Sequence, residues 1–462
     1  MVDFLYNSKK FQATLTPTRV ILLGFIVIIL IGSLFLTLPI SNKDGKWLSY
    51  IDSLFTATSA VCVTGLVVRD TAVQFTGFGQ AVILILIQIG GLGFMTVATL
   101  IFIMMGKKIT LRERLAIQES MVQYNLQGLV KLIRAVGLMT LIIETTGALL
   151  LMITFVPYYG FWKGVYFSFF HSISAFCNAG FDIMGTTAAP YQGYSVFATS
   201  FLACFPLLIL IIIGGLGFTV MRDIINTRKW PKLNIHSKVV LTMSGILIVV
   251  GTLFFMVSEY NNNLTIGNMS FGDKLLASLF QSVTPRTAGF STINQGDMTS
   301  ASKLFTILLM FIGASPGSTG GGIKTTVLFV IIVLVVSNLR GRNQALIDKQ
   351  EISSKKIMKA VTIIVFAMSI IFISATLIML SEQGKPGMSF EKIIFEAVSA
   401  FGTVGLSMGI TPYLSTFSKF IVTLTMYLGR VGPLSVGIAL AAKYGVGVNN
   451  NIKYPEAKIM VG

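Results

Sequence analysis

Charge is scarce in this chain of 462 residues, because Asp, Glu, Lys and Arg together make up 11% of it, against roughly 25% in an ordinary soluble domain. Cysteine and histidine are also scarce, with three and two residues, so neither a disulfide framework nor a Cys/His zinc site is expected. Hydrophobic residues, in contrast, make up 54% of the chain. This composition excludes a water-soluble globule and predicts an integral membrane protein.

Long apolar runs predict eight membrane-spanning helices, since one crossing needs about 20 such residues. The runs lie at about 20–40, 78–105, 131–156, 196–221, 238–258, 303–336, 359–380 and 416–442. The net charge of +17 falls mainly in the links on one side of these spans. Because Lys and Arg gather on the cytoplasmic side, we expect a multi-pass protein of the plasma membrane with both termini in the cytoplasm.

Four shorter apolar segments recur between the spans, at about 49–61, 162–176, 271–284 and 389–401. They are too short to cross a bilayer, which favours re-entrant pore helices. Each is followed by a tetrapeptide that ends in glycine: Cys62-Val63-Thr64-Gly65, Cys177-Asn178-Ala179-Gly180, Arg286-Thr287-Ala288-Gly289 and Gly402-Thr403-Val404-Gly405. The glycines are 115, 109 and 116 residues apart. The fold class predicted is therefore all-α and integral to the membrane, with four pseudo-symmetric repeats of helix, pore loop and helix around one pore.

The spacing divides the chain into repeats at 1–105, 106–222, 223–336 and 337–462, the last with a C-terminal tail. A second signal supports the division, because Ile89–Phe94 and Ile213–Phe218 have the same sequence and Leu428–Pro433 stands at the matching place. In the third repeat this place is taken by a Gly-rich stretch: Gly313-Ala314-Ser315-Pro316-Gly317-Ser318-Thr319-Gly320-Gly321-Gly322-Ile323-Lys324. Five glycines and one proline inside an apolar run predict that the helix breaks at this stretch.

The four tetrapeptides have the composition of an ion filter. Backbone carbonyls can replace the hydration shell of an ion only where some residues adopt angles that glycine tolerates best. The pore helices would also direct their negative dipole ends toward the axis, which favours a cation. The competing interpretation is that the glycines are helix caps or close-packing residues.

These tetrapeptides, the segment Thr284–Phe290, the Gly-rich stretch and Arg430 together resemble the Trk/Ktr/HKT superfamily of potassium transporters, and within it the KtrB-type membrane subunits. The resemblance covers nearly the whole chain. It implies K⁺ uptake through a selectivity filter made by the four tetrapeptides, with K⁺ as the substrate, Na⁺ as a possible activator and no covalent cofactor. It also implies a homodimer with a cytosolic nucleotide-binding ring subunit of the KtrA type, and glycine at all four filter positions resembles the potassium-selective members.

The same resemblance implies that the Gly-rich stretch is an intramembrane gate below the filter. Arg430 stands where the first two repeats have Gly91 and Gly215, so we expect it to form the gate together with that stretch. The alternatives are a passive helix kink for the stretch and an arginine held by helix packing. The segment Gly313–Gly317 also fits the nucleophile-elbow pattern, but no strand precedes it, so a serine hydrolase is disfavoured.

Three further charged residues fall within membrane-depth segments. Arg286 lies inside a filter tetrapeptide, and we expect it to turn away from the axis and pair with a carboxylate such as Glu396. Glu144 is expected to be a packing residue rather than a proton relay. The functions that remain open are a regulated K⁺ uptake subunit, a stand-alone cation channel, a sodium-translocating relative and, least favoured, a membrane hydrolase.

Overall fold

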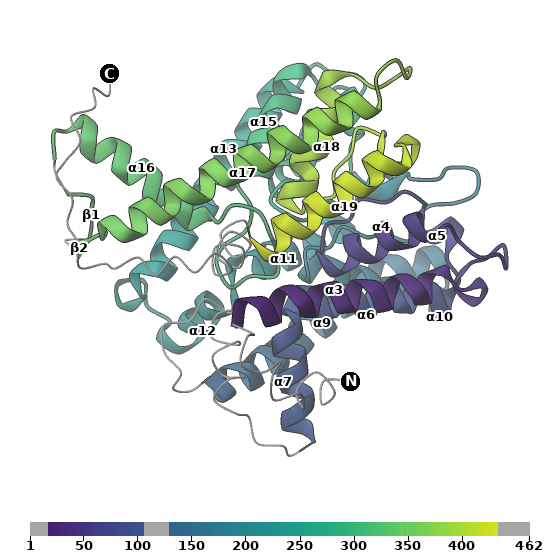
Figure 1. Cartoon of the computed structure of the whole chain (residues 1–462), viewed down its shortest axis with the longest axis horizontal. Helices are drawn as coiled ribbons and strands as arrows, with labels where there is room; N and C mark the ends of the chain where they lie inside the picture. The colour runs from purple at the N-terminus through teal and green to yellow at the C-terminus, as the bar shows by residue number, and fades with distance from the viewer. Residues whose placement is uncertain (1–16, 106–128, 343, 349, 433–462) are drawn as a thin grey trace.

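The computed structural model describes residues 17–105, 129–342, 344–348 and 350–432, and these residues are mainly helical (Figure 1). The predicted boundary between the first two repeats, both chain termini and the C-terminal tail lie outside or at the edge of the described residues. Within them the chain forms four successive units, each with a long helix, a short buried helix and a further apolar helix.

The four units follow one another along the chain without interleaving. Unit one contains α3 (Pro17–Thr37), α4 (Tyr50–Val61), the short α5 (Thr71–Gln74), α6 (Gly77–Leu92) and α7 (Phe94–Met104). Unit two contains α9 (Leu129–Tyr159), α10 (Phe161–Phe176), α11 (Phe201–Leu216) and α12 (Phe218–Thr227). Unit three contains α13 (Ile235–Ser258), α14 (Phe271–Val283), α15 (Ser300–Phe311) and α16 (Thr325–Leu339). Unit four contains α17 (Ser354–Ser381), α18 (Phe390–Gly402) and α19 (Thr416–Val431), preceded by the two-residue strands β1 (Leu346–Ile347) and β2 (Gln350–Glu351).

Four of these helices, α3, α9, α13 and α17, are long and apolar enough to cross a membrane. Two expected spans, 78–105 and 196–221, are not single straight helices, since α6 and α7, like α11 and α12, meet at 98°. Each bend falls on a glycine with positive φ, at 79° for Gly93 and 96° for Gly217, a conformation that other residues resist. In unit three the helix breaks between α15 and α16, as the sequence predicts.

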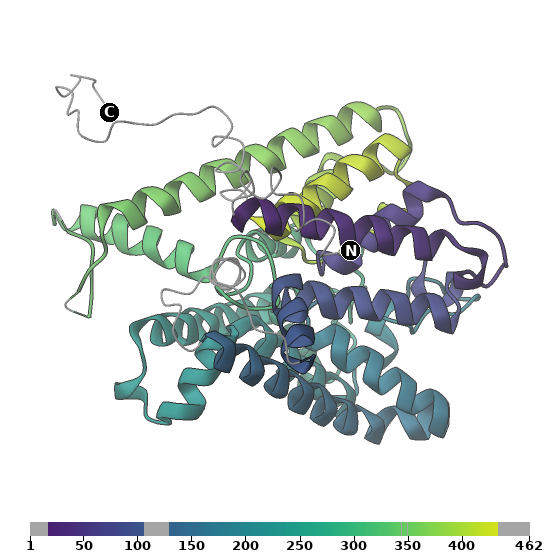
Figure 2. The same cartoon turned by 60° about the horizontal axis from the view of Figure 1, so that its bottom comes forward.

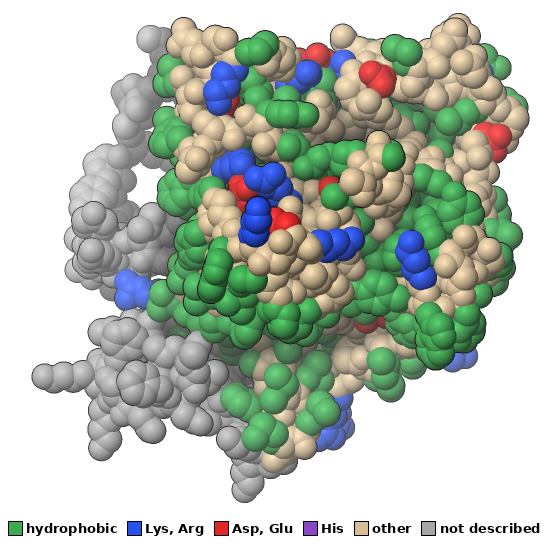
Figure 3. Space-filling model, turned by 90° about the vertical axis from the view of Figure 1, so that its right-hand side faces the viewer, with side chains coloured by type: hydrophobic (Ala, Val, Ile, Leu, Met, Phe, Trp, Pro, Cys, Tyr) green, Lys and Arg blue, Asp and Glu red, His purple; other side chains and the backbone are tan. Residues whose placement is uncertain are grey.

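The outer faces of the long helices are hydrophobic. On α17, for example, Met368 and Phe372 have 59% and 74% of their surface exposed. Soluble monomers rarely show extended apolar patches of this kind, so lipid is the natural cover for these faces. Charged side chains of both signs are scattered over the end of the molecule that Figure 3 presents, with hydrophobic side chains over much of the rest.

The four units close into a ring through one repeated contact. The further apolar helix of each unit packs on the short buried helix of the next unit. The pairs are α6 with α10, α11 with α14, α15 with α18, and α19 with α4. The last pair joins the end of the chain to its beginning, and α3 and α19 lie close together in both views (Figures 1 and 2). The short helices are therefore enclosed at the centre, where α4 and α18 are almost wholly buried.

Three carboxylates, those of Asp52, Glu259 and Glu382, bind groups at the ends of helices. They lie on the side of the molecule where the loops after the short helices are found. Asp52 bridges units one and four, with one oxygen 2.7 Å from Lys419 Nζ and the other 3.1 Å from Arg69 Nε. Glu259 accepts a hydrogen bond from Thr299 N at 2.8 Å, and Glu382 accepts one from Ser415 N at 2.9 Å. Because the first N–H groups of a helix have no partner inside it, these two glutamates complete the starts of α15 and α19.

Candidate functional site

The four tetrapeptides lie at the ends of the short helices α4, α10, α14 and α18, as the sequence predicts. The first two follow their helices directly, the third begins three residues after the end of α14, and the fourth begins with the last residue of α18. A hydroxyl near the end of each helix holds the tetrapeptide to it. Ser59 Oγ accepts from Gly65 N at 3.0 Å, and Ser399 Oγ accepts from Gly405 N at 3.1 Å. In units two and three, Ser174 Oγ donates to Phe181 O at 2.7 Å and Thr284 Oγ1 donates to Phe290 O at 2.6 Å.

The backbone has the same unusual pattern in all four tetrapeptides. The second and fourth residues have positive φ: Val63 56°, Gly65 89°, Asn178 56°, Gly180 67°, Thr287 76°, Gly289 76°, Thr403 50° and Gly405 93°. Left-handed angles are uncommon for β-branched residues such as Val63 and Thr403, and such strain gathers at functional sites. Alternation of left-handed with ordinary residues turns successive carbonyls toward the same side of the strand, the arrangement that an ion filter needs.

The four glycines form a closed ring. A Cβ built on Gly65 would lie 2.5 Å from Ala179 O, and one on Gly180 would lie 2.6 Å from Ala288 O. A Cβ on Gly289 would collide with Val404 O, and one on Gly405 would collide with Thr64 O, at still shorter distances. Each glycine thus faces the third carbonyl of the next tetrapeptide, and the fourth faces the first. Units separated by more than 300 residues in sequence are brought together, and any side chain at these positions would collide with backbone.

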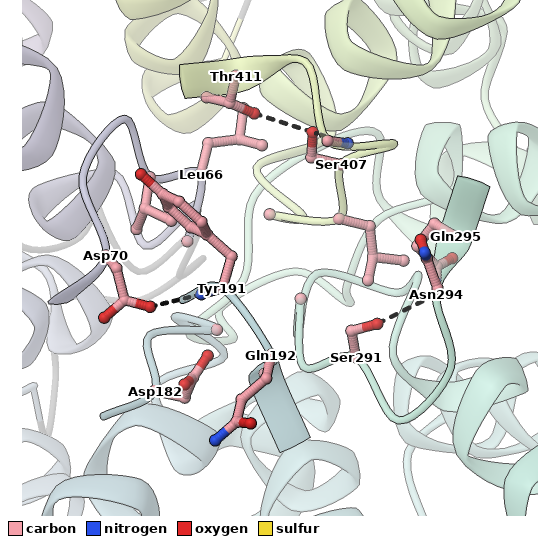
Figure 4. A pocket seen from close by; sticks show the side chains of 18 of the residues that line it. Leu66, Asp70, Asp182, Tyr191, Gln192, Ser291, Asn294, Gln295, Ser407 and Thr411 are labelled. Carbon is pink, nitrogen blue, oxygen red and sulfur yellow. Dashed lines mark hydrogen bonds between the residues drawn. The ribbon is translucent and has the colours of Figure 1, made fainter. Parts of the chain in front are cut away.

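A cavity of about 480 Å³ opens directly onto this ring. We call it the vestibule; all four ring glycines line it, together with residues of the loops that follow them (Figure 4). Asp70 and Asp182 are the charged residues among the described residues that line it. Asp70 is held by backbone, because its carboxylate accepts from Val73 N at 2.8 Å and from Tyr191 N at 2.7 Å.

The Gly-rich stretch does not belong to the described lining of the vestibule and is bound to units two and four. Thr319 Oγ1 is 3.1 Å from both Phe176 O at the end of α10 and Gly214 O in α11. Gly321 N donates to Thr403 Oγ1 at 3.1 Å, so the stretch contacts the fourth tetrapeptide. Lys324 Nζ donates to Gly320 O at 2.8 Å and to Gly321 O at 3.2 Å. The segment Gly313–Lys324 is therefore a folded, hydrogen-bonded loop and not a simple kink in a helix.

Arg430 joins this loop to the rest of the ring. Its guanidinium, carried by α19 of unit four, donates to Thr319 O in the loop and to Gly90 O in α6 of unit one. The side chain therefore extends from α19 to both the loop and α6. The guanidinium thus places a positive charge between the Gly-rich loop and α6.

The expected pair of Arg286 and Glu396 is wrong. Arg286 is buried and its guanidinium donates to Ser244 Oγ at 3.0 Å on α13, with no carboxylate within ion-pair distance among the described residues. Glu396 accepts instead from Ser407 Oγ at 2.8 Å and Thr411 Oγ1 at 2.5 Å. The side chain of Arg286 does turn outward, but its two terminal nitrogens donate to neutral oxygens of Ser244 on a neighbouring helix, and its Nε has no partner among the described residues. Glu396 instead fixes the loop that follows the fourth tetrapeptide.

Glu144 of α9 contacts Cys177, the first residue of the second tetrapeptide. One carboxylate oxygen accepts from Gln88 Nε2 at 3.3 Å and the other is 3.9 Å from Cys177 Sγ. These neutral partners agree with a packing role. The sequence analysis included Thr319 in the Gly-rich stretch but did not predict its contacts with unit two. It missed Asp182, which could have been found because it is the one acidic residue two positions after a ring glycine.

The described residues offer no other candidate centre. No group of three or more His, Cys, Asp or Glu side chains is placed to hold a metal ion in the described part of the chain. Ser315, the candidate nucleophile, shares a hydrogen bond of 3.0 Å with Thr325, whereas His171 is bound to Phe167 O within α10. The groups of the tetrapeptides that could replace the water of a cation are their backbone carbonyls.

Comparison with known proteins agrees with this geometry. Residues 5–450 match the family TrkH, described as cation transport protein. The chain is 43% identical over 447 residues to the Ktr system potassium uptake protein B of Bacillus subtilis, an alignment that covers 97% of each protein. It is 38% identical over 457 residues to the potassium/sodium uptake protein NtpJ of Enterococcus hirae, covering 98% of this chain and 99% of that protein. The crystal structure of the potassium transporter TrkH from Vibrio parahaemolyticus has the same fold, with a TM-score of 0.72 at 17% identity, over 96% of this chain and 89% of the other.

Proposed function

This chain belongs to the TrkH family of cation transport proteins, a family of transporters and not of enzymes, and on that premise we propose that it is the translocating subunit of a K⁺ uptake system. The closed ring of glycines and carbonyls carries the proposal. The relatives named as potassium uptake proteins match nearly the full length of the chain and support K⁺ as the substrate.

In the proposed mechanism K⁺ enters from the vestibule and loses water to the carbonyls of the selectivity filter. The filter consists of residues 62–65, 177–180, 286–289 and 402–405, with the ring oxygens of Thr64, Ala179, Ala288 and Val404 at its centre. Because these ligands are backbone dipoles held by the short helices, they need little rearrangement to bind an ion. The helix ends behind them add partial negative charge directed at the same axis.

Below the filter, the loop Gly313–Lys324 and Arg430 form the gate. In this proposal the closed state is the one in which the loop is bound to α10, α11 and the fourth tetrapeptide and Arg430 is bound to Thr319 O. Opening requires the loop to leave these partners. The hydrogen bonds that the loop would give up are made to neutral oxygens, so the loop is suited to be a two-state element.

The wider assembly follows from the same proposal. Eight crossings with both termini cytoplasmic, a homodimer with one pore in each chain, and a cytosolic nucleotide-binding ring subunit would complete a regulated system. The word "system" in the name of the Bacillus subtilis relative supports a multi-subunit complex. Na⁺ acts in this proposal as an activator of K⁺ uptake at the plasma membrane.

A second candidate function is transport of Na⁺ together with K⁺. The relative from Enterococcus hirae is named for uptake of both ions, and it is similar to this chain over nearly its whole length. The first candidate predicts that K⁺ competes with ⁸⁶Rb⁺ far better than Na⁺ does, and the second predicts comparable competition.

The experiment is ⁸⁶Rb⁺ uptake into proteoliposomes that contain the full chain, with K⁺, Na⁺ or choline as competitor. Block by K⁺ but not by choline supports the proposal. A parallel sample with residues 317–322 deleted removes the centre of the gate. If neither protein carries Rb⁺ while both remain folded in detergent, the proposed function is wrong.

A further inference from the structure

The residues two positions beyond the ring glycines form a second ring in the vestibule. They are Val67, Asp182, Ser291 and Ser407, and all of them line the cavity. Ser291 Oγ and Ser407 Oγ donate to Ile293 O and to Glu396, so their hydroxyls are engaged. Asp182 is the single charged member. This ring of four positions therefore carries one negative charge, contributed by unit two, and Asp70 of unit one is the other carboxylate in the described lining of the vestibule.

Asp182 differs from the neighbouring Asp70 in how it is held. Asp70 is fixed by two backbone N–H groups of different units and stabilises the loops around the vestibule. Asp182 receives one hydrogen bond among the described residues, from Met184 N at 3.1 Å. Arg69, which follows the first tetrapeptide, is paired with Asp52, and no Lys or Arg belongs to the described lining of the cavity. The charge of Asp182 is thus not neutralised by a partner.

We propose that Asp182 draws monovalent cations to the entrance of the filter and so sets the apparent affinity of uptake. This inference rests on the proposed function and adds a residue that determines the apparent affinity for the cation. Two trans peptide steps place the Cα of Asp182 within about 7.6 Å of that of Gly180. At about 8 Å, a unit charge raises the local population of a monovalent cation about twofold in water and about thirtyfold at an effective dielectric constant of about 20.

The charge of Asp182 also depends on pH. Burial raises the pKa of Asp182 to about 6, with the charge of Asp70 adding to the effect and the Met184 N–H opposing it. The other titratable side chains around it are Tyr159 of α9, His171 of α10, which accepts from Ile183 N at 3.5 Å, and, next to Asp70, Tyr191. Units three and four present only uncharged side chains such as Asn294 and Ser407 to the vestibule among the residues that line it. The negative charge is therefore present above pH 6 and is lost as the pH on the vestibule side falls through about 6.

The test is ⁸⁶Rb⁺ uptake by the full chain in bacterial cells that lack their own K⁺ transporters. At low ionic strength, Asp182→Asn is expected to raise the half-saturating concentration about threefold to tenfold and to leave the maximal rate unchanged. The effect should shrink at high ionic strength, since screening acts over about 10 Å at about 0.1 M salt. Asp44→Asn serves as the matched control, because Asp44 is an exposed carboxylate outside the vestibule.

A second variant tests position rather than identity. Val67 occupies the same place in unit one, so Val67→Asp combined with Asp182→Asn returns one charge to the ring and should restore the half-saturating concentration. The wild type should lose affinity as external pH falls from about 7 to about 5, and Asp182→Asn should not. The inference is overturned if Asp182→Asn leaves the half-saturating concentration unchanged or raises it no more than Asp44→Asn does.

Failure of this inference and failure of the proposed function give different results. If the wild type carries no Rb⁺ in cells, the same substitutions are compared in the variant lacking residues 317–322. Absence of flux in both backgrounds, with protein present in the membrane, defeats the proposed function and this inference with it. If flux is present but its half-saturating concentration does not depend on Asp182, this inference alone is wrong.

Discussion

Replacement of Arg430 by alanine should open the gate. The guanidinium makes one charge-assisted hydrogen bond to the loop, to Thr319 O, and its other contact, to Gly90 O, anchors it to unit one. A hydrogen bond to a charged group contributes about 1.5–3 kcal/mol, which corresponds to a factor of roughly 10 to 150 in the balance between closed and open loop. Removal of a positive charge from the ion path favours K⁺ entry further.

The assay is basal ⁸⁶Rb⁺ flux in proteoliposomes with this chain alone, where the gate limits the rate. Arg430→Ala is expected to raise the flux about tenfold or more, up to the point at which the filter becomes limiting. Arg430→Lys keeps the charge but loses the planar fork that reaches two carbonyls, so it should give an intermediate flux. Unchanged flux in Arg430→Ala, with the protein folded and monodisperse, would refute the assignment of Arg430 to the gate.

Other parts of the structure lead to three more expected outcomes. Gly405→Ala places a Cβ against Thr64 O, and we expect loss of about 90% or more of Rb⁺ flux with normal membrane insertion; normal flux would contradict the ring geometry. Thr319→Val removes the hydroxyl that binds Phe176 O and Gly214 O, a loss of about 1 kcal/mol that should raise basal flux severalfold, whereas reduced flux would argue against a closed loop. Glu382→Gln should lower the free energy of unfolding by about 1–2 kcal/mol through the weakened cap of α19. Although burial opposes ionisation, hydrogen bonds from Lys385, Ser415 and Ser418 lower the pKa of Glu382 to about 2, so this stabilisation is complete above its ordinary pKa of 4.5 and is lost as pH falls toward 2. Thermal unfolding in detergent at about pH 6 and about pH 3 measures the difference, and equal pH dependence in wild type and Glu382→Gln would exclude the cap.

The tetrapeptides could be located from the sequence because the same pattern recurs in all four repeats. The tetrapeptides end in glycine at near-constant spacing, and the structure shows why, since each glycine faces a carbonyl of the next unit. The short helices begin and end close to the bounds of the expected segments. The break in unit three was equally visible, because glycine and proline clustered in an apolar run are poorly compatible with a continuous helix.

Contacts between units were harder to predict. Arg286 was matched with Glu396 on charge alone, yet its terminal nitrogens bind the neutral oxygens of Ser244. Such neutral partners leave no periodic or compositional signal. The 98° bends at Gly93 and Gly217 were also missed, since an apolar run that bends on one glycine has the same hydropathy as a straight span.

The most direct test of the filter is crystallographic, with Rb⁺ in place of K⁺ and data collected at the rubidium absorption edge. The account predicts an anomalous peak on the axis between Thr64 O, Ala179 O, Ala288 O and Val404 O, which disappears when Rb⁺ is replaced by choline. A structure with Rb⁺ bound elsewhere and none within reach of these four carbonyls would contradict it.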